Sequence, residues 1–355
     1  MPTAEFAGTR EAGGRNVPGM LQLVVHASRG WFRTPHSAVG FVPYMTSHRT
    51  LFIPLLAAAA LLVKAPAAEG QHDRYRDRDE NESRIDTTVA FSRTGTVELE
   101  LPSGEIIVTG WTRDQVRVRA TSERGAIRFD ASPSLLTLGM RGGHSDETRF
   151  EVTVPVGARV RATSNSGDIR IVGTRGEVEA HAQSGDVTVE DAGPRVEINA
   201  FSGDAAATRI TGDLTVSALS GDVRVVGVTG DVEAKTVSGD VTIRDARSRS
   251  VRASSTSGDI AYEGTIDAAG RYELQTHSGD VDLTIPADVG AMLTVSTYNG
   301  GVESDFPLTL QPGAHGKTFT FQLGKGGARI SAESFSGDVN IRSRGGRPGR
   351  DDNDR

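Results

Sequence analysis

The sequence predicts an all-β protein whose main body is a parallel β-helix or β-roll solenoid with about 18 residues per coil, preceded by a β-rich cap. Two observations support this fold class. The tripeptide Ser-Gly-Asp recurs at a regular spacing, and the residues on both sides of it alternate between apolar and polar. A fixed period of this length is typical of repeat architectures. Alternation with a period of two is typical of strands that bury one face and expose the other.

The Ser-Gly-Asp tripeptide is predicted to be the turn that closes each coil. Glycine adopts positive φ angles at little cost, and Asp and Ser favour turns. Five copies follow one another at a constant interval, three looser copies start at Ser257, Ser278 and Ser336, and Asn299-Gly300-Gly301 is a degenerate copy. The predicted turn residues of the five regular copies are Ser166 and Gly167, Ser184 and Gly185, Ser202 and Gly203, Ser220 and Gly221, and Ser238 and Gly239.

Two short strands are predicted in each coil, one on either side of this turn. Val196 and Ile198 alternate with polar residues before one turn, and Val187 and Val189 do so after another. A second turn is indicated by pairs such as Gly212-Asp213, which lies nine residues after the preceding Ser-Gly-Asp glycine. Nine residues accommodate a strand of about five and a turn of about four. Because the inward positions are mostly Val, Ile, Leu and Ala, the interior is expected to be narrow.

Residues 45–67 are predicted to be a secretory signal peptide. Arg49 provides the positive charge, the apolar run Leu51–Val63 follows, and Ala65-Pro66-Ala67 matches the small-residue cleavage rule. The run is shorter than the ~20 residues of a membrane span, and the alternatives are a buried helix or an uncleaved anchor. We therefore expect an exported protein without a membrane span in the mature chain, located in the periplasm, on the cell surface or outside the cell. Residues 1–44 are predicted to be a mis-assigned upstream segment, with translation starting at the signal peptide.

The other segments flank the predicted solenoid, which spans residues 156–342. Residues 68–84 are dense in both charge signs and are expected to form a disordered linker, and residues 343–355 a disordered tail. Residues 85–155 have strand-like alternation without the period, and are expected to form a β-rich cap that covers the first coil. The gap between the degenerate copy and the last Ser-Gly-Asp is expected to form one distorted coil with an outward hairpin.

Composition and motifs exclude several classes of function. The chain contains no cysteine, which removes disulfides, thiol catalysis and cysteine zinc sites. A formal net charge of -7 without a basic stripe argues against a nucleic-acid partner. The histidines have no metal-ligand spacing, with His181 and His277 at outward strand positions and His144 and His315 in loops. No nucleophile elbow, phosphate loop or HExxH motif is present, so we expect no cofactor and no enzymatic activity.

Three strand-like segments, Gly104–Trp111, Val116–Ala120 and Phe150–Pro155, precede the repeated Ser-Gly-Asp-[Val/Ile]-x-[Val/Ile] units. Together these patterns resemble a family of exported bacterial "putative adhesin" proteins with β-strand repeats, a domain of unknown function. The resemblance covers about residues 91–342. It implies a β-solenoid outside the cytoplasm, but no activity and no catalytic or binding residues, because a fold does not fix a function.

The motif aspartates are predicted to form a ladder, because equivalent positions of successive coils stack on one another. Carboxylates about 5 Å apart repel by roughly 1 kcal/mol near a surface, so something should offset this. We favour hydrogen bonds from backbone N–H groups within each turn. The alternative is calcium between the coils, although the Gly-Gly-x-Gly-x-Asp pattern of calcium-binding β-rolls is absent. The speculative cation ladder comprises Asp168, Asp186, Asp204, Asp222 and Asp240, continued by Asp259, Asp280 and Asp338.

These patterns favour an exported non-enzymatic interaction module that binds a protein or glycan partner in the cell envelope. A long regular polar face suits an extended partner. The outward positions mix Arg, Glu, Thr and Lys without an aromatic stripe, which weakens a sugar-stacking site. A purely structural envelope protein is the alternative. A polysaccharide-acting β-helix enzyme is a further one, but such sites need an irregular cluster of acids, whereas the acids here follow the repeat.

Overall fold

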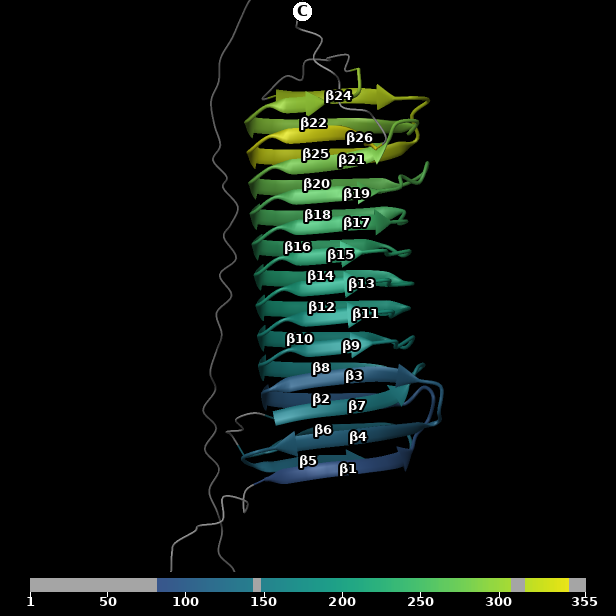
Figure 1. The fold of residues 1–355 in the computed structure, drawn as a ribbon. Helices are drawn as coiled ribbons and strands as arrows, with labels where there is room; N and C mark the ends of the chain where they lie inside the picture. The colour runs from purple at the N-terminus through teal and green to yellow at the C-terminus, as the bar shows by residue number, and fades with distance from the viewer. Residues whose placement is uncertain (1–81, 143–147, 308–316, 345–355) are drawn as a thin grey trace, which may run out of the picture. The chain divides into compact units, whose positions relative to one another are not determined.

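The computed structural model of the protein describes residues 82–142, 148–307 and 317–344. These residues form strands β1 to β26, which are arranged in two 13-stranded sheets that pack face to face (Figure 1). The prediction of an all-β solenoid is confirmed. The described part of the chain contains no helix that is long and apolar enough to cross a membrane. The predicted upstream segment, the signal peptide, and most of the predicted linker and tail lie outside the described residues.

We call the sheet that contains β1 sheet A and the sheet that contains β2 sheet B. Each of seven regular coils contains one strand of sheet B, a Ser-Gly-Asp turn and one strand of sheet A. Neighbouring coils pair in parallel, with Val196 opposite Val178 and Ser202 opposite Ser184. One period of the sequence repeat therefore corresponds to one coil. The strands of sheet B are β8 (Arg159–Ser166), β10 (Val178–Ser184), β12 (Arg195–Ser202), β14 (Asp213–Ser220), β16 (Val232–Ser238), β18 (Ser250–Ser257) and β20 (Arg271–Ser278). Those of sheet A are β9 (Ile169–Val172), β11 (Val187–Glu190), β13 (Ala205–Thr208), β15 (Val223–Val226), β17 (Val241–Ala246), β19 (Ile260–Gly264) and β21 (Val281–Pro286).

The core is a narrow aliphatic layer between the two sheets. Val187 and Val189 of sheet A and Ile198 of sheet B are fully buried, as the alternation predicts. Burying one such side chain contributes about 1.5–3 kcal/mol. Within the seven regular coils, Tyr262 and Tyr272 are the bulky exceptions, and their rings meet edge to face with centroids 5.7 Å apart. They lie between the turn serines Ser257 and Ser278, an interval longer than the regular one, so a longer coil accommodates the larger side chains.

The N-terminal end of the stack begins with a coil that the sequence period does not reveal. Strands β2 (Thr96–Ser103) and β3 (Glu105–Trp111) pair in parallel with β8 and β9, placing Ser103 opposite Ser166. Gly104 has a φ of 125°, so Ser103-Gly104-Glu105 is a further copy of the turn. The interval predicted as a separate cap, residues 85–155, therefore contributes a coil of its own.

Five further strands cover this end of the stack. In sheet A, β7 pairs in parallel with β3, β4 pairs antiparallel with β7, and β1 pairs antiparallel with β4. In sheet B, β6 pairs in parallel with β2 and β5 pairs antiparallel with β6. These strands are β1 (Ser83–Ala90), β4 (Gln115–Ser122), β5 (Ala126–Ala131), β6 (Leu135–Arg141) and β7 (Thr148–Pro155).

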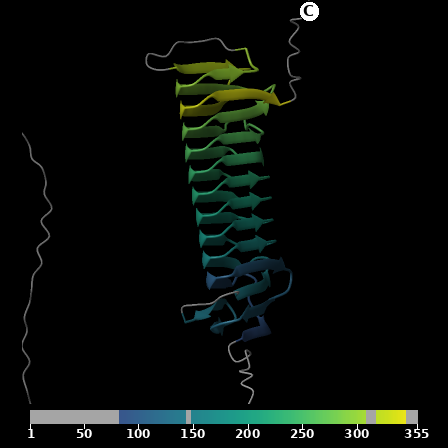
Figure 2. The same cartoon turned by 60° about the vertical axis from the view of Figure 1, so that its left-hand side comes forward.

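The C-terminal coils do not stack in chain order. Strands β25 (Ala328–Ser336) and β26 (Val339–Arg344) lie directly next to β20 and β21. Strands β22 (Ala291–Asn299) and β23 (Val302–Ser304) follow beyond them, and both views show the yellow coil inserted between green ones (Figure 1, Figure 2). Strand β24 (Lys317–Leu323) pairs antiparallel with β22 and ends sheet B. The turns therefore follow one another in the order Ser278, Ser336, Asn299.

Candidate functional site

The motif aspartates form a continuous ladder in which each carboxylate accepts a hydrogen bond from the backbone of the next coil. Oδ1 of Asp186 accepts a hydrogen bond from the backbone N–H of Asp204 at 2.8 Å, and Oδ1 of Asp204 accepts one from Asp222 at 2.8 Å. The expectation that each carboxylate is bonded within its own turn was therefore wrong. A hydrogen bond to a charged group contributes about 1.5–3 kcal/mol, which exceeds the roughly 1 kcal/mol repulsion between neighbouring carboxylates. The bonded acceptors are Asp168, Asp186, Asp204, Asp222, Asp240, Asp259, Asp280 and Asp338.

The glycine of each turn is required by the close approach of successive coils. Gly203 has a φ of 139°, and a Cβ atom there would lie 2.1 Å from the carbonyl oxygen of Gly185. The N–H of Gly203 donates to the carbonyl of Ser220 in the next coil at 3.0 Å. The Ser-Gly-Asp turn thus carries two rows of inter-coil hydrogen bonds, one to a main-chain carbonyl and one to a carboxylate.

The titratable groups with shifted pKa values belong to the structure of the coils. The pKa of Glu179 is lowered because Arg161 of the preceding coil donates to its carboxylate at 2.7 Å. The pKa of Asp191 is lowered in the same way by Arg209. Burial raises the pKa of Tyr262, whose hydroxyl donates to the carbonyl of Thr265 at 3.0 Å. Within the described residues, no group of three or more His, Asp or Glu side chains is placed to hold a metal ion.

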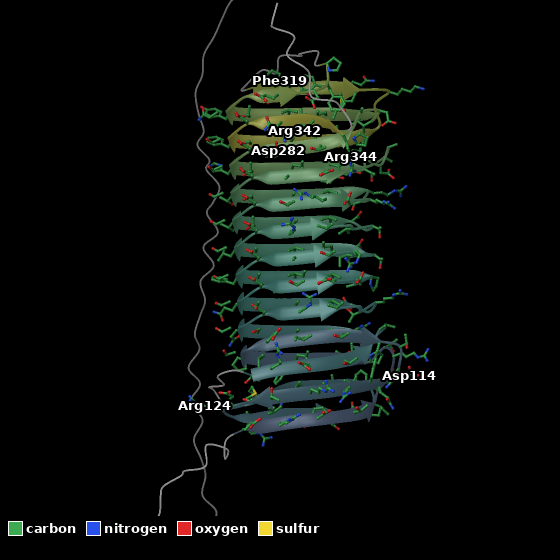
Figure 3. All side chains as sticks on the ribbon, viewed as in Figure 1. Asp114, Arg124, Asp282, Phe319, Arg342 and Arg344 are labelled. Carbon is green, nitrogen blue, oxygen red and sulfur yellow. The ribbon has the colours of Figure 1, made fainter. Side chains whose placement is uncertain are left out.

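Ion pairs also connect adjacent coils over the outer faces of both sheets. In sheet A, Arg342 of β26 lies 3.5 Å from Asp282 of the neighbouring β21 (Figure 3). In sheet B, Arg252 pairs with Glu273 at 2.8 Å. Each exposed pair contributes little to stability, on the order of 0–1 kcal/mol. Together they leave these faces charged but locally balanced.

One column of side chains on sheet B departs from this charged pattern. It consists of the residue that immediately precedes the first residue of each turn motif from Ser166 onward, and we call it the outer column. Along the stack its members are Asn165, Gln183, Phe201, Leu219, Val237, Thr256, His277, Phe335 and Tyr298. Its exposed apolar and aromatic members form two groups of neighbours, one containing Phe201, which is 57% exposed, and one containing Tyr298, which is 64% exposed. Exposed apolar side chains that lie next to one another are typical of binding surfaces.

Three rings of the outer column stack on one another. The imidazole of His277 lies parallel to the ring of Phe335, with centroids 4.7 Å apart and an interplanar angle of 8°. Phe335 and Tyr298 are 5.0 Å apart at 3°. The expectation that the outward positions contain no aromatic stripe was therefore wrong. Each ring precedes the first residue of a turn motif, so aligning the motifs would have revealed the column, but the order of the rings depends on the inserted coil.

Two hollows lie beside the outer column, on the outer face of sheet B. The lower hollow encloses about 470 Å³ between Phe201 and Leu219 on one side and His181 and Asn199 on the other, with Ala200 on its floor. It is lined by Thr163, Ser164, Asn165, His181, Ala182, Gln183, Asn199, Ala200, Phe201, Ser217, Ala218 and Leu219. Its floor is formed by Ala182, Ala200 and Ala218, which lie opposite one another in adjacent coils.

The upper hollow encloses about 620 Å³ beside the three stacked rings. Gln275, Ser296 and Glu333 form its polar side. Floor hydroxyls are already bonded to main-chain carbonyls, since Thr276 donates to Gly258 at 2.9 Å and Ser334 donates to Gly279 at 2.8 Å. The lining comprises Ser254, Ser255, Thr256, Gln275, Thr276, His277, Ser296, Thr297, Tyr298, Glu333, Ser334 and Phe335. Both hollows thus have one ring-bearing or apolar side and one polar side.

Comparison with known proteins identifies a family and finds several solved structures of low similarity. Residues 144–342 match the family model described as Toastrack DUF4097. Among solved structures, a "putative cell adhesion protein" from Clostridium sporogenes is 8% identical with a TM-score of 0.20, the alignment covering 74% of this chain and all of that one.

Two further structures are described as a "putative adhesin". The one from Bacteroides fragilis is 11% identical with a TM-score of 0.32, over 73% of this chain and 96% of that one. The one from Parabacteroides merdae is 10% identical with a TM-score of 0.26, over 74% and 97%. Similarity this low carries no functional conclusion. None of the curated proteins matches the chain.

Proposed function

The chain belongs to the Toastrack DUF4097 family, and from this premise we propose that it is an exported, non-enzymatic interaction module that binds an extended glycan or protein partner in the cell envelope. The observation that carries the proposal is the outer column with its two hollows. Among the described residues, five of the seven exposed large hydrophobic side chains lie in this strip, beside small polar ones, and the other two are Leu135 and Met292. An exposed apolar strip costs solubility, and its retention on a surface is typical of a site that another molecule covers.

The rigidity of the strip supports binding. Each outer-column residue is the penultimate residue of a strand whose backbone is paired with both neighbouring coils, as Phe201 is in β12. A backbone paired in this way needs no further ordering when a partner covers its side chains, and a reduced ordering cost improves affinity. The hollows follow successive coils, which suits an extended partner better than a compact one.

The composition of the hollows favours binding over catalysis. Among the described residues that line them, Glu333 is the only carboxylic acid. Glycoside hydrolysis ordinarily requires two carboxyl groups on opposite sides of the scissile bond. Export is supported by the signal-like pattern of residues 45–67, with its apolar run Leu51–Val63.

A purely structural envelope protein remains the second candidate, favoured by the unbroken ladder of inter-coil hydrogen bonds. Binding assays separate the two. The full chain is applied to an oligosaccharide array and to fractionated envelope proteins, beside the variants Phe201→Ser and Phe335→Ser and the control Arg224→Ser on the exposed face of sheet A. The proposal expects a ligand that the control retains and at least one phenylalanine variant loses. Binding that is equal in all variants, or no binding at all, favours the structural role.

A further inference from the structure

The stack of rings in the outer column ends at an open ring face. The rings of His277, Phe335 and Tyr298 are separated by 4.7 and 5.0 Å, which is the spacing of adjacent strands in a sheet. The neighbour of His277 on the other side is Thr256, because Ser257 pairs with Ser278. Thr256 is exposed and lines the upper hollow. A short side chain therefore occupies the level at which a fourth ring would continue the stack.

The gap at Thr256 has the dimensions of one more ring. One coil further along the outer column is Val237, which is 44% exposed. A flat six-membered ring at the level of Thr256 would lie between the imidazole of His277 and the side chain of Val237. The face of the imidazole and the valine side chain suit a ring with apolar faces, and Phe335 holds His277 in the orientation that presents its own face.

The polar side of the upper hollow indicates what the rim of that ring carries. Ser254, Gln275 and Ser296 offer hydroxyl and amide groups. Glu333 offers a carboxylate, one oxygen of which accepts a hydrogen bond from Ser331 at 2.8 Å, while the other has no hydrogen-bond partner among the described residues. These groups match the many hydroxyls of a sugar.

The charge of the hollow restricts the ligand further. Its described lining contains no Lys or Arg, and the single carboxylate of Glu333 repels anions. A phosphate-rich or uronate-rich polymer would bring its charges to a site without cations, which is unfavourable. The hollow therefore suits an uncharged chain.

The position of the hollow disfavours an extended peptide. Peptides that bind to sheets usually add a strand to a free edge, where main-chain hydrogen bonds provide affinity. Strands β18, β20 and β25 are each paired on both sides within sheet B. A peptide in the hollow would lie on the face of the sheet without main-chain partners, whereas a sugar brings its own donors and acceptors.

We propose that the upper hollow binds an uncharged glycan, with one pyranose ring stacked on the open face of His277 at the level of Thr256. This proposal rests on the binding function proposed above and assigns the ligand class and position. The sugar hydroxyls meet Ser254, Gln275 and Glu333, and the remainder of the glycan follows the coils along the outer column.

The main variant of the test adds a side chain at the level of Thr256, where the sugar ring is proposed to bind. In Thr256→Phe a fourth ring occupies the level of the sugar, while the three existing rings and the core are unchanged. The matched control is Arg224→Phe, which places the same side chain at an exposed position on the outer face of sheet A. A separate variant, Asn165→Phe, fills the lower hollow and tests that alternative site. Phe335→Ala removes the support of His277. Melting temperatures check that all four variants remain folded.

The probes are cello-, chito-, xylo- and manno-hexaose with the full chain, and isothermal titration measures the affinity. We expect at least one hexaose to bind, Thr256→Phe to weaken its binding at least about tenfold, and Phe335→Ala to weaken it about two- to tenfold, as the loss of one aromatic contact does. Arg224→Phe should leave the affinity unchanged.

Other outcomes overturn the proposal. If a hexaose binds but Asn165→Phe blocks it and Thr256→Phe does not, the site is the lower hollow, and the general binding function stands. If no hexaose binds, but the oligosaccharide array or the envelope proteins of the binding assay above yield an anionic glycan or a protein as the ligand, the ligand class is wrong, and the binding function again stands. If none of these ligands binds in a variant-sensitive way, both proposals fail.

Discussion

The replacement Gly221→Ala tests whether close approach of the coils dictates the turn. Gly221 has a φ of 141°, and a Cβ atom there would lie 2.1 Å from the carbonyl oxygen of Gly203 and 2.6 Å from its carbonyl carbon. Neither atom can move alone, because both turns are fixed by hydrogen bonds to adjacent coils. For a residue with a Cβ atom, this backbone conformation costs about 1–3 kcal/mol. Moving the backbone to relieve the overlap costs a further ~1–3 kcal/mol.

The expected loss for Gly221→Ala is therefore about 2–6 kcal/mol of unfolding free energy. The matched control is Gly227→Ala in the same coil. Gly227 also has a positive φ, 72°, but the nearest atoms to its added Cβ are 3.8 Å away, so only the backbone cost of about 1–2 kcal/mol applies. Urea unfolding of the full chain, followed by circular dichroism, measures both values. If Gly221→Ala loses no more stability than Gly227→Ala, close approach is not what requires glycine in the turn.

Three further predictions concern the ladder and the ion pairs. Asp222→Asn retains the acceptor for the N–H of Asp240, which is 2.9 Å away, and removes repulsion, so its urea midpoint should match or exceed that of the wild type. Asp222→Ala should lose about 1 kcal/mol of unfolding free energy. An equal loss in Asp222→Asn and Asp222→Ala would mean that the negative charge, and not the hydrogen-bond acceptor, stabilises the ladder. The pKa of Glu273 is lowered by hydrogen bonds from Arg252 and then Arg271, so its stabilisation is present above the ordinary value of 4.5 and is lost as the pH falls through the lowered value. Glu273→Gln should therefore reduce the urea midpoint near pH 7 and leave it unchanged near pH 2, and a constant difference at both pH values would contradict the assignment. Because backbone N–H groups already occupy one oxygen of each ladder carboxylate, excess EDTA should leave the melting temperature unchanged, whereas a drop would support the calcium ladder.

The regular coils could be predicted from the sequence because one local rule repeats. In every coil the alternation selects which side chains are buried, as Val187 and Val189 illustrate, and the Ser-Gly-Asp turn follows at a constant distance. Parallel pairing in register then places identical positions on top of one another. The strand and turn propensities of each repeat and the stacking of the coils favour the same structure, so the regular coils can be predicted without information from the rest of the chain.

The sequence period did not reveal the first coil, formed by β2 and β3, because its turn residues and spacing differ from those of the regular coils. Its turn has Glu105 in the aspartate position, and a long insertion separates Ser103 from Ser166. The inserted residues form the antiparallel strands that cover the end of the stack. Glu105 forms an ion pair with Arg149, which lies directly opposite it in the paired strand β7. A period search requires constant spacing, and an insertion of this length removes that signal while the fold retains the coil.

The aromatic stack needed information that no local pattern contains. His277, Phe335 and Tyr298 each precede the first residue of a turn motif, so their outward position can be read from the sequence. The contact between the three rings cannot be read from the sequence. Phe335 lies between His277 and Tyr298 only because β25 is inserted between β20 and β22. Chain order would instead place Tyr298 next to His277.

The degenerate turn gives a physical reason for the inserted order. In the observed order Asp280 accepts from the N–H of Asp338 at 2.7 Å, and Asp338 accepts from the N–H of Gly301 at 2.7 Å. In chain order Gly301 would lie between them. The N–H of Asp338 would then face a residue without a carboxylate, and the carboxylate of Asp338 would have no following coil to bond. The observed order therefore retains one additional charge-assisted hydrogen bond, about 1.5–3 kcal/mol. Gly301, which has no acceptor to offer, fits best at the end of the ladder, so the residue that breaks the repeat also fixes its coil as the last one.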